Sequence, residues 1–469
     1  MNRRTLLLKQ SRVMELLEER DKAASMSRWE KAELDKELRR EIASIWETDE
    51  LRRTKPTPVE EAMGGLYVVE QSLWDALPRV MRRLDYTSEK LLGGRRLPLP
   101  DPTNNTNQHA MSQLQFGSWM GGDRDGNPNV TPEITLEIAL LSRWGAADLI
   151  LRDIRKLRLD LSVSSSFHRV SPAVALLAMR GRAWSHVAAD ATLDESQEPY
   201  RDALRCVEGR IRATRLSVEK ELKEARKGMA EAGSKPTNFT RPFPFTSGGN
   251  DSSRGNGHGG AGGGGGGKGG AATKAAPYHS KRELLEDLLA MHSSLTGSWR
   301  YPSSRTDAGG GMCWGAMTAE GGDERLTILA DGPLLDTIRR VDVFGLTLLP
   351  LDMRQDSARH TEALDQITAS LGMESSYGTW GEQQRQNWLL RELESSRPLI
   401  VPSMLHPGTS PFSAAASEVL RTFRVAAELG PESVNEYIIS MAKRPSDVLA
   451  VELLRRKVAQ GCLEGGDNR

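Results

Sequence analysis

Three kinds of absence narrow the class of this protein. Its 469 residues include only three cysteines, Cys206, Cys313 and Cys462, which lie far apart. An odd and scattered set of this kind builds neither a disulfide framework nor a zinc site, and it indicates a reducing compartment. No stretch approaches the ~18 consecutive apolar residues of a membrane-spanning helix. The 63 basic and 63 acidic residues cancel, so no charge surplus points to a polyanionic partner.

We therefore expect a cytosolic protein that binds neither membranes nor nucleic acids. The basic start, Met1-Asn2-Arg3-Arg4, is followed by only a brief apolar stretch before Lys9 and Gln10, which does not fit a secretory signal. A long glycine-rich part of the chain has few basic or aromatic residues that could contact phosphates or stack on bases, so it does not indicate a nucleic-acid-binding protein.

The most informative stretch is 116–131, which reads FGSWMGGDRDGNPNVT. Its apolar start predicts a short strand that stops at Gly121-Gly122, and Thr-Pro-Glu at 131–133 opens a helix as N-cap, first helical residue and first-turn acid. A strand, a glycine-rich polar turn and a helix are the elements with which α/β proteins build a site at the carboxyl end of a strand. Because glycine lets the backbone approach a ligand closely, Arg124 and Asp125 in this turn are candidate ligand-binding residues.

Two alternatives apply to the same stretch. A surface turn capped by Asp123 and Asn127 also accounts for the local composition without any ligand. An EF-hand calcium loop does not. Counted from Asp123, the position that must be glycine is Pro128, and the position that must be a bidentate glutamate is Ile134.

A second stretch, 344–364, reads FGLTLLPLDMRQDSARHTEAL. Residues 343–353 are apolar on both alternating faces, which predicts a parallel strand covered on both sides. Asp352 and Arg354 share one face at its carboxyl end, where a guanidinium can bind pairs of carboxylate or phosphate oxygens. The alternative for Arg354 is a buried ion pair with Asp352. His360 could be taken for a general base, but at the start of the following helix it fits a structural hydrogen bond better.

Helical periodicity marks most of the remaining chain. Apolar residues recur at helical spacing through about 5–86, 134–161, 200–232 and 281–295, and a further buried strand is expected at 437–441. About three buried strands separated by long helical intervals predict a mainly α protein around an α/β barrel of the TIM type. We expect this barrel to be incomplete, with only those strands present.

Residues 233–277 are different in kind. They contain SGGNDSSRGNGHGGAGGGGGGKGGAATKAA and almost nothing able to form a core, which predicts a disordered insert. The run Gly262–Lys268 matches the start of a P-loop. However, Gly269 replaces the Ser or Thr that would hold magnesium and no strand precedes the run, so nucleotide binding is not expected. The insert separates a first region, 1–232, from a second region, 278–469.

Both informative stretches closely resemble segments of phosphoenolpyruvate carboxylases, where they line the active site. Weaker resemblance extends through TDELRRTKPTPVEEAM, SLWDALPRVMRRLD and YIISMAKRPSDVLAVELL. The resemblance implies a β barrel within a mainly helical body. It also implies an enzyme that forms oxaloacetate and phosphate from phosphoenolpyruvate and bicarbonate, which feeds the tricarboxylic acid cycle. It makes Arg354, Gln355, Arg124 and Asp125 substrate-binding residues and puts Trp119 beside the bicarbonate pocket.

The resemblance stops short of the family's catalytic histidine and metal ligands. That histidine lies in an Ala-His-Pro-Thr stretch just upstream of the Arg-Arg-Thr found here at Arg3-Arg4-Thr5, where this chain has Met1-Asn2. The family uses Mg²⁺ or Mn²⁺, and its metal-binding Glu and Asp lie further on, so no metal ligand is assigned to this chain. The sequence resembles about the first half of such an enzyme. We expect the isolated chain to be inactive and to expose unpaired strand edges.

Regulation and assembly are implied by the same resemblance. Arg3, Arg4 and Arg52 fall where plant-type members bind an activating sugar phosphate, although three solvated arginines on charged helices fit equally well. The insert resembles that of the bacterial-type carboxylases of plants and green algae, so the implied assembly is a homotetramer or a hetero-oligomer with plant-type subunits. The alternative function is that of a non-catalytic regulatory or scaffolding subunit, which would use 233–277 as an interaction segment.

Overall fold

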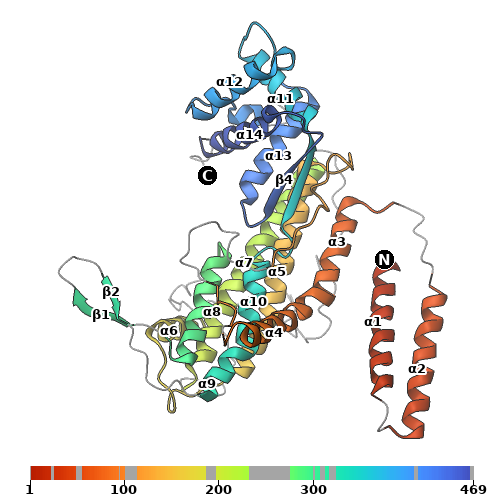
Figure 1. Ribbon diagram of the computed structural model, residues 1–469, viewed down its shortest axis with the longest axis vertical. Coiled ribbons are helices and arrows are strands. Elements are labelled where there is room, and N and C mark those ends of the chain that lie inside the picture. The colour runs from red at the N-terminus through yellow and green to blue at the C-terminus, as the bar shows by residue number, and fades with distance from the viewer. Residues whose placement is uncertain are drawn as a thin grey trace, which may run out of the picture. The chain divides into compact units, whose positions relative to one another are not determined.

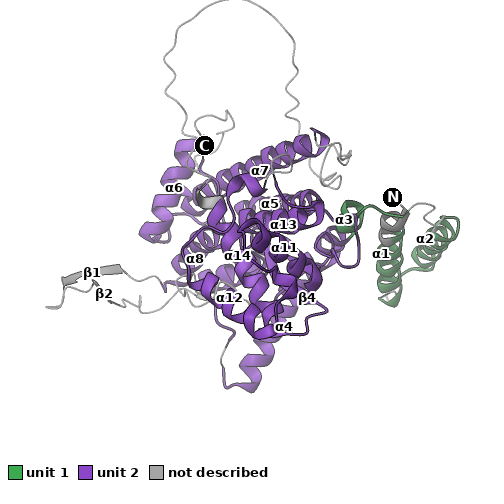
Figure 2. Cartoon of the chain, turned by 90° about the horizontal axis from the view of Figure 1, so that it is seen from above, with its two compact units in different colours: residues 1–64 green, residues 65–469 purple. Residues whose placement is uncertain are grey.

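The computed structural model of the protein is dominated by helices, as the sequence predicts (Figure 1). It describes residues 2–22, 26–48, 55–94, 96–100, 114–185, 197–231, 275–298, 301–306, 312–315, 324–405 and 410–464. Nearly all of the expected insert, 233–277, therefore lies outside the described residues. The chain forms two compact units, residues 1–64 and 65–469, which are coloured separately in Figure 2.

The first unit is built on a pair of helices, α1 (Asn2–Asp21) and α2 (Arg28–Trp46). Helix α2 begins with a capping box, because the Ser27 hydroxyl accepts from the Glu30 N–H while the Glu30 carboxylate accepts from the Ser27 N–H. Three leucines, Leu16, Leu34 and Leu38, form the buried contact between the helices. Of the arginines expected to bind an effector, Arg3 and Arg4 belong to α1, and Arg52 lies outside the described residues.

Long helices form the first layer of the second unit. Helix α5 (Pro132–Asp160) starts as predicted, since the Thr131 hydroxyl accepts from the Ile134 N–H and Pro132 takes the first helical position. It packs against α7 (Pro199–Glu231), which also packs against α6 (Pro172–Ser185).

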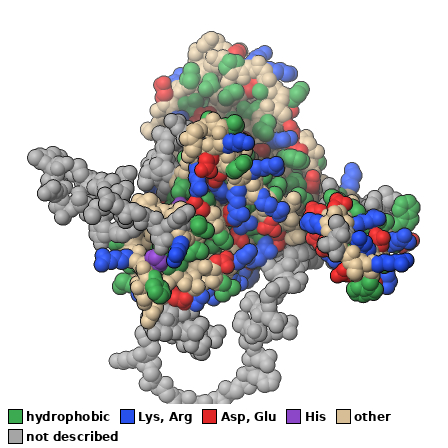
Figure 3. All heavy atoms as spheres, turned by 60° about the horizontal axis from the view of Figure 1, so that its bottom comes forward, with side chains coloured by type: hydrophobic (Ala, Val, Ile, Leu, Met, Phe, Trp, Pro, Cys, Tyr) green, Lys and Arg blue, Asp and Glu red, His purple; other side chains and the backbone are tan. Residues whose placement is uncertain are grey.

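Figure 3 shows basic and acidic side chains interspersed over the face of the molecule that it presents.

The other elements complete this unit and the segment that enters it. They are α3 (Pro58–Val68), η2 (Val69–Leu73), α4 (Trp74–Leu91), α8 (Lys281–Thr296), β1 (Tyr301–Thr306), β2 (Met312–Gly315), α9 (Glu324–Leu329), η4 (Ala330–Leu334), α10 (Leu335–Phe344), β3 (Leu351–Asp356), α11 (Ser357–Ser370), η5 (Tyr377–Thr379), α12 (Glu382–Glu394), η6 (Pro402–Leu405), α13 (Ala414–Leu429), β4 (Val434–Ser440) and α14 (Pro445–Glu464). Strands β1 and β2 pair as an antiparallel hairpin, which the sequence analysis did not predict.

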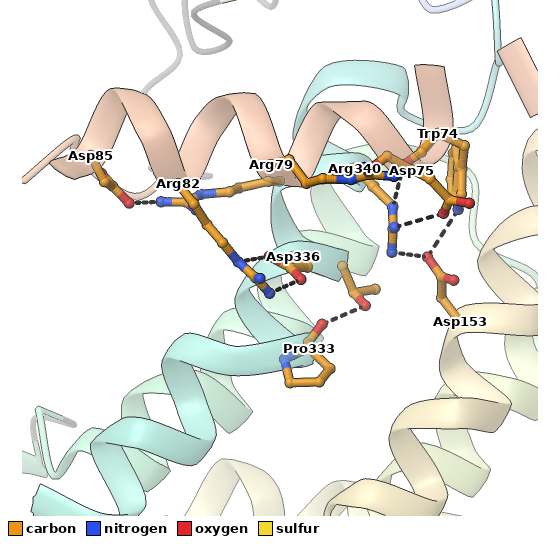
Figure 4. A network of polar contacts seen from close by, with 11 residues as sticks. Trp74, Asp75, Arg79, Arg82, Asp85, Asp153, Pro333, Asp336 and Arg340 are labelled. Atoms are coloured by element: carbon orange, nitrogen blue, oxygen red, sulfur yellow. Dashed lines mark hydrogen bonds and ion pairs between the residues drawn. The ribbon is translucent and has the colours of Figure 1, made fainter. Parts of the chain in front are cut away.

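Polar side chains join α4 to α10 and α5 (Figure 4). Arg340 of α10 donates to the Asp153 carboxylate at 2.9 Å and to the Trp74 carbonyl oxygen at 2.8 Å, and the Trp74 indole donates to the same carboxylate at 3.2 Å. Burial raises the pKa of the Asp153 carboxyl, while the positive charge of Arg340 opposes that rise. Two further ion pairs, Arg82–Asp336 and Arg339–Asp85, join α4 to α10. The contacts fix which face of each helix meets the other.

The chain that returns from the glycine-rich segment is anchored on α7. The Cα of Gly209 lies beside Ala275, since a methyl group added there would meet the Ala275 side chain at 3.5 Å. Three residues on, the Tyr278 N–H donates to the Thr214 hydroxyl at 2.8 Å, and the Arg210 guanidinium lies 3.7 Å from the centre of the Tyr278 ring. The chain thus re-enters the fold well back along α7 from the point at which it left.

The sheet of the second unit contains two parallel strands, β3 and β4. On the other side of β3, residues 118–123 run parallel to it and are joined to it by bridges at Ser118–Leu351 and Asp123–Arg354. The order across the sheet is therefore the 118–123 segment, β3 and β4. Two strands and one bridged segment do not by themselves establish the expected barrel of the TIM type.

The predicted strand at 343–353 is wrong over residues 343–350, because β3 begins at Leu351. Helix α10 continues to Phe344 and ends at Gly345, which has a positive φ of 61°, and residues 346–349 form buried bends before β3 begins. A short apolar run is compatible with a buried helix end as well as with a buried strand, so periodicity could not separate the two.

The predicted buried strand at 437–441 is also corrected. It begins earlier, at Val434, and ends at Ser440. Its residues are half-buried or exposed: Ile438 is 40% exposed, and the following Met441, which has a positive φ of 56°, is 66% exposed. Among the described residues no strand pairs with the outer edge of β4, which explains why an apolar strand is not covered on both sides.

A second core lies where α11, α13 and α14 pack together, and it holds His360. The His360 Nε2 atom lies 2.7 Å from the Tyr437 hydroxyl oxygen, and the Tyr437 ring stacks on Phe423 with their centres 5.0 Å apart. Burial lowers the pKa of His360 from 6.5 to about 4, so the imidazole is neutral near pH 7. His360 lies in the first turn of a helix and in a structural hydrogen bond, as the sequence analysis expected.

Replacement of Gly181 tests the contact between α6 and α7. A Cβ atom at this position would overlap the backbone carbonyl oxygen of Asp202. We expect Gly181→Ala to lower the free energy of unfolding by about 2 kcal/mol in urea titrations. Gly228 of α7 faces open space and is the matched control, for which alanine should raise the free energy of unfolding by about 0.5–1 kcal/mol. Effects of the same sign at the two positions would contradict this packing.

The buried His360 predicts a pH dependence of stability. Because its pKa is lower in the folded than in the unfolded chain, the unfolded chain gains a proton first as the pH falls from 6.5 towards 4, and up to about 3 kcal/mol of stability is lost. His360→Leu removes this contribution. In urea unfolding across this range, the stability difference between wild type and variant should shrink as the pH falls. The exposed His279 is the control, since His279→Leu should leave the slope unchanged. If the stability difference between wild type and His360→Leu does not change with pH, His360 is not the source of the pH dependence.

Candidate functional site

The site is built where the 116–131 stretch meets β3. Backbone hydrogen bonds connect them: Ser118 N–H to the Pro350 carbonyl (2.9 Å), Asp352 N–H to the Ser118 carbonyl (2.8 Å), Arg354 N–H to the Gly122 carbonyl (2.8 Å) and Arg124 N–H to the Arg354 carbonyl (3.2 Å). The two informative stretches of the sequence, more than two hundred residues apart, are thus neighbours in one sheet. The short strand expected at the start of 116–131 is present only as bridged positions on either side of a turn.

Two glycines make this turn, each for a different physical reason. Gly121 has a φ of 94°, a left-handed conformation that L side chains rarely adopt, and a Cβ there would lie against Ile138 of α5. Gly122 comes so close to the backbone of Asp352 that a Cβ would overlap its carbonyl oxygen. The turn is closed by the Gly122 N–H, which donates to the Trp119 carbonyl at 2.8 Å. The sequence Gly-Gly is therefore required by conformation at one position and by close approach at the other.

The alternation of the sheet sorts the candidate residues onto two faces. Along β3, Leu351, Met353 and Gln355 are buried while Asp352, Arg354 and Asp356 are half-buried. Paired residues on adjacent strands point to the same face and successive residues to opposite faces. Since Asp123 pairs with Arg354 and Ser440 with Asp356, those residues and Asp125 share the face of Arg354. By the same rule, Arg124 shares the opposite face with Gln355 and Tyr437.

We call the first of these the open face, defined by Trp119, Asp123, Asp125, Asp352, Arg354 and Ser440. The Arg354 guanidinium carbon lies 6.0 Å from the centre of the Trp119 ring, and Trp119 is 52% exposed. Arg354 makes no ion pair with a described carboxylate, and its Nε is buried without a hydrogen-bond partner. The alternative of an Arg354–Asp352 ion pair is thus not observed among the described residues. Asp352 instead accepts from the Asn435 amide at 3.0 Å.

A carboxylate beside Arg354 stays ionised. The pKa of the Asp125 carboxyl is lowered by a hydrogen bond with the Asp123 carboxyl, by the neighbouring Ser440 hydroxyl and by the positive charge of Arg354. The open face therefore carries one guanidinium next to fixed negative charge and an exposed indole. Such an arrangement holds the guanidinium in place while leaving it able to bind an added anion.

The opposite side is the covered face, which includes Arg124, Gln355, Met353 and Tyr437. Arg124 is 8% exposed, its Nη2 donates to the Thr135 hydroxyl at 2.5 Å, and its Nε and Nη1 have no partner in the described part of the chain. Burial lowers the pKa of its guanidinium. Gln355 is 5% exposed, and its side-chain oxygen accepts from the Asp356 N–H at 3.0 Å. The structure thus brings together Trp119, Asp125 and Arg354, and it separates Arg124 and Gln355 from them.

Two residues of the open face, and the Asn435 that donates to one of its carboxylates, were missed by sequence reasoning as site residues. Asp123 lies within the 116–131 stretch, where its spacing of two from Asp125 could have assigned both to one face. Asn435 and Ser440 belong to β4, and they come beside Asp352 and Asp125 only through the parallel pairing of β4 with β3. No local signal in the sequence identifies them.

The described residues contain no group of three or more His, Cys, Asp or Glu side chains placed to hold a metal ion. The acidic residues of the open face are thus not arranged as a metal centre. None of the described helices combines the length and the apolar character needed to cross a membrane.

Comparison with known proteins identifies the family to which this chain is similar. The family model for phosphoenolpyruvate carboxylase matches residues 1–300 and 319–466. Phosphoenolpyruvate carboxylase 4 of Arabidopsis thaliana is 36% identical over 494 residues, covering 97% of this chain and 46% of the relative. The phosphoenolpyruvate carboxylases of Pseudomonas aeruginosa and Hahella chejuensis are 38% and 36% identical, each over 97% of this chain and 39% of the relative.

The chain thus spans less than half the length of the curated relatives that it matches. The match runs through both informative stretches and through the helical regions around them. On this similarity, the chain belongs to the phosphoenolpyruvate carboxylase family.

Proposed function

We propose that the open face is part of the substrate site of a phosphoenolpyruvate carboxylase. The observation that carries the proposal is Arg354, a guanidinium held beside the exposed Trp119 without an ion pair to any described carboxylate. Phosphoenolpyruvate presents a phosphate and a carboxylate, and both bind guanidinium groups through two parallel hydrogen bonds. The family and its named relatives support this substrate.

The proposed reaction converts phosphoenolpyruvate and bicarbonate to oxaloacetate and phosphate. The phosphoryl group passes from the enol oxygen to a bicarbonate oxygen, which leaves the enolate of pyruvate and carboxyphosphate. Carboxyphosphate gives up its proton and releases carbon dioxide and phosphate, and the enolate carbon then bonds to carbon dioxide. In this scheme Arg354 binds an anionic group of phosphoenolpyruvate, and the Trp119 ring covers one side of the site where carbon dioxide must be kept from water.

The remaining open-face residues orient Arg354. The ionised Asp125 attracts the guanidinium, whereas Asp352 accepts from the Asn435 amide. Arg124 and Gln355 lie on the covered face, so the proposal gives them no direct contact with substrate. A divalent Mg²⁺ or Mn²⁺, which the family implies, would neutralise charge on the enolate and phosphate. The described residues do not form a set of ligands for it.

We infer that the sheet belongs to a larger barrel of the TIM type. Strand β4 has an outer edge without a described partner, and the apolar Ile438 on its open-face side is 40% exposed. Further parallel strands on that edge would cover this surface and bring more charged residues to the same end of the sheet. We therefore propose that this chain alone does not catalyse the reaction. We also propose that the active form is a cytosolic oligomer, either a homotetramer or an assembly with plant-type subunits.

Binding of an unreactive analogue tests the site without requiring turnover. We choose 2-phosphoglycolate, which carries the same phosphate and carboxylate, and isothermal titration calorimetry of this chain. Arg354→Gln should weaken binding by about 10–100-fold, since a hydrogen bond to a charged group contributes roughly 1.5–3 kcal/mol. Arg359→Gln is the matched control, because Arg359 lies five residues on and pairs with Glu362.

The control should bind as the wild type does. Equal weakening in both variants would mean that general charge and not the position of Arg354 determines binding. Absence of binding to the wild-type chain would contradict the assignment of the open face as a site that this chain can form.

A further inference from the structure

One buried hydroxyl links the turn of the 116–131 stretch to helix α5. Thr135 is fully buried in the first turns of α5, and its Oγ1 lies 2.6 Å from the Gly121 carbonyl oxygen. The same oxygen accepts from the Arg124 Nη2 at 2.5 Å, and it lies 3.2 Å from the Thr131 carbonyl, the ordinary partner of a helical threonine. Thr135 thus makes two contacts with the turn in addition to the usual one within its helix.

The direction of each hydrogen bond follows from the chemistry of the groups. A guanidinium can only donate, so Arg124 occupies a lone pair of the Thr135 oxygen. A hydroxyl has one proton, and the shorter of its two carbonyl contacts is the one to Gly121. Arg124 therefore orients the Thr135 O–H towards the Gly121 carbonyl, and the three residues form one chain of hydrogen bonds.

Gly121 is the point in the turn at which such a contact has most effect. Its left-handed φ sets the direction in which the backbone leaves the turn, and Ile138, one helical turn beyond Thr135, lies against its Cα. Trp119 and Asp123 stand two residues before and two residues after Gly121, and both belong to the open face. A change in the orientation of Gly121 therefore moves both of them relative to Arg354, which is fixed in β3.

We propose that Thr135 and Arg124 are positioning residues for the open face, acting through the Gly121 carbonyl from the covered side of the sheet. Their role in substrate binding rests on the proposed function, whereas their effect on the turn does not. Arg124 then serves the site without touching substrate, which agrees with its burial, its position opposite Arg354 and its hydrogen bond to Thr135.

The experiment compares Thr135→Val with Thr135→Ser. Valine keeps the shape but removes the hydroxyl, and serine keeps the hydroxyl. Thr422→Val is the matched control, because Thr422 is also buried and its hydroxyl bonds to the carbonyl of Glu418 in its own helix. The first readout is acrylamide quenching of Trp119, obtained as the difference between each protein and the same protein carrying Trp119→Phe. The second is the Kd for 2-phosphoglycolate.

We expect Thr135→Val to change the quenching constant of Trp119 and to raise the Kd about tenfold, as expected for small displacements within a site. Thr135→Ser should restore both values, and Thr422→Val should leave both unchanged even if it lowers stability. Unchanged Trp119 quenching in a folded Thr135→Val protein overturns the proposal. So does an equal change in Thr422→Val.

Arg124→Met provides a second route if Thr135→Val does not fold. This variant should change the quenching constant of Trp119 in the same direction as Thr135→Val does. Adding Thr135→Ser should not restore the wild-type value. A large loss of 2-phosphoglycolate binding with unchanged Trp119 quenching would make Arg124 a direct ligand and overturn its positioning role. If the wild-type chain fails to bind 2-phosphoglycolate, the proposed function loses its support, and the quenching data alone still decide whether Thr135 and Arg124 hold the turn.

Discussion

The backbone pairing between residues 118–124 and β3 is the constraint on which the site depends. Its hydrogen bonds join two stretches distant in sequence and set the register at which Asp123 meets Arg354. Register in a sheet decides the face of every side chain, because a shift by one residue turns each of them to the other side. Once this register is fixed, Arg354 lies on the open face and Arg124 on the covered face. In the sequence, by contrast, each arginine has an aspartate within two residues.

The two faces differ in physical character as well as in direction. On the covered face, Arg124 and Gln355 are buried, and a buried polar atom without a partner is costly. On the open face, Arg354 and Asp125 interact across a partly solvated surface. A contact between charges there can be replaced by a contact with a ligand at a lower cost in free energy than in a buried site. A single short sheet thus separates the buried polar groups of one face from the partly solvated charged groups of the other.

Much of this could be predicted from the sequence, and the failures have identifiable causes. The start of α5 was predictable because Thr131 and Pro132 act through local hydrogen bonding and a fixed φ. The shared face of Asp352 and Arg354 followed from alternation within one strand. The separation of Arg124 from Arg354 could not be predicted, since it depends on the register between segments that are not adjacent in sequence. The extent of β3 was misjudged because a buried helix end and a buried strand have the same apolar composition.

The anchoring of Tyr278 on α7 has a consequence for how the chain can change over evolution. The chain leaves α7 at Glu231 and returns beside Gly209, so the two points are separated by about 33 Å of helix. About ten extended residues would cover that length. The interval 232–274 is several times longer, so its length is not dictated by the geometry of the helices that flank it. Insertions and deletions there leave Arg210, Thr214 and Tyr278 in contact, and whatever selects the composition of this interval acts on something other than the fold.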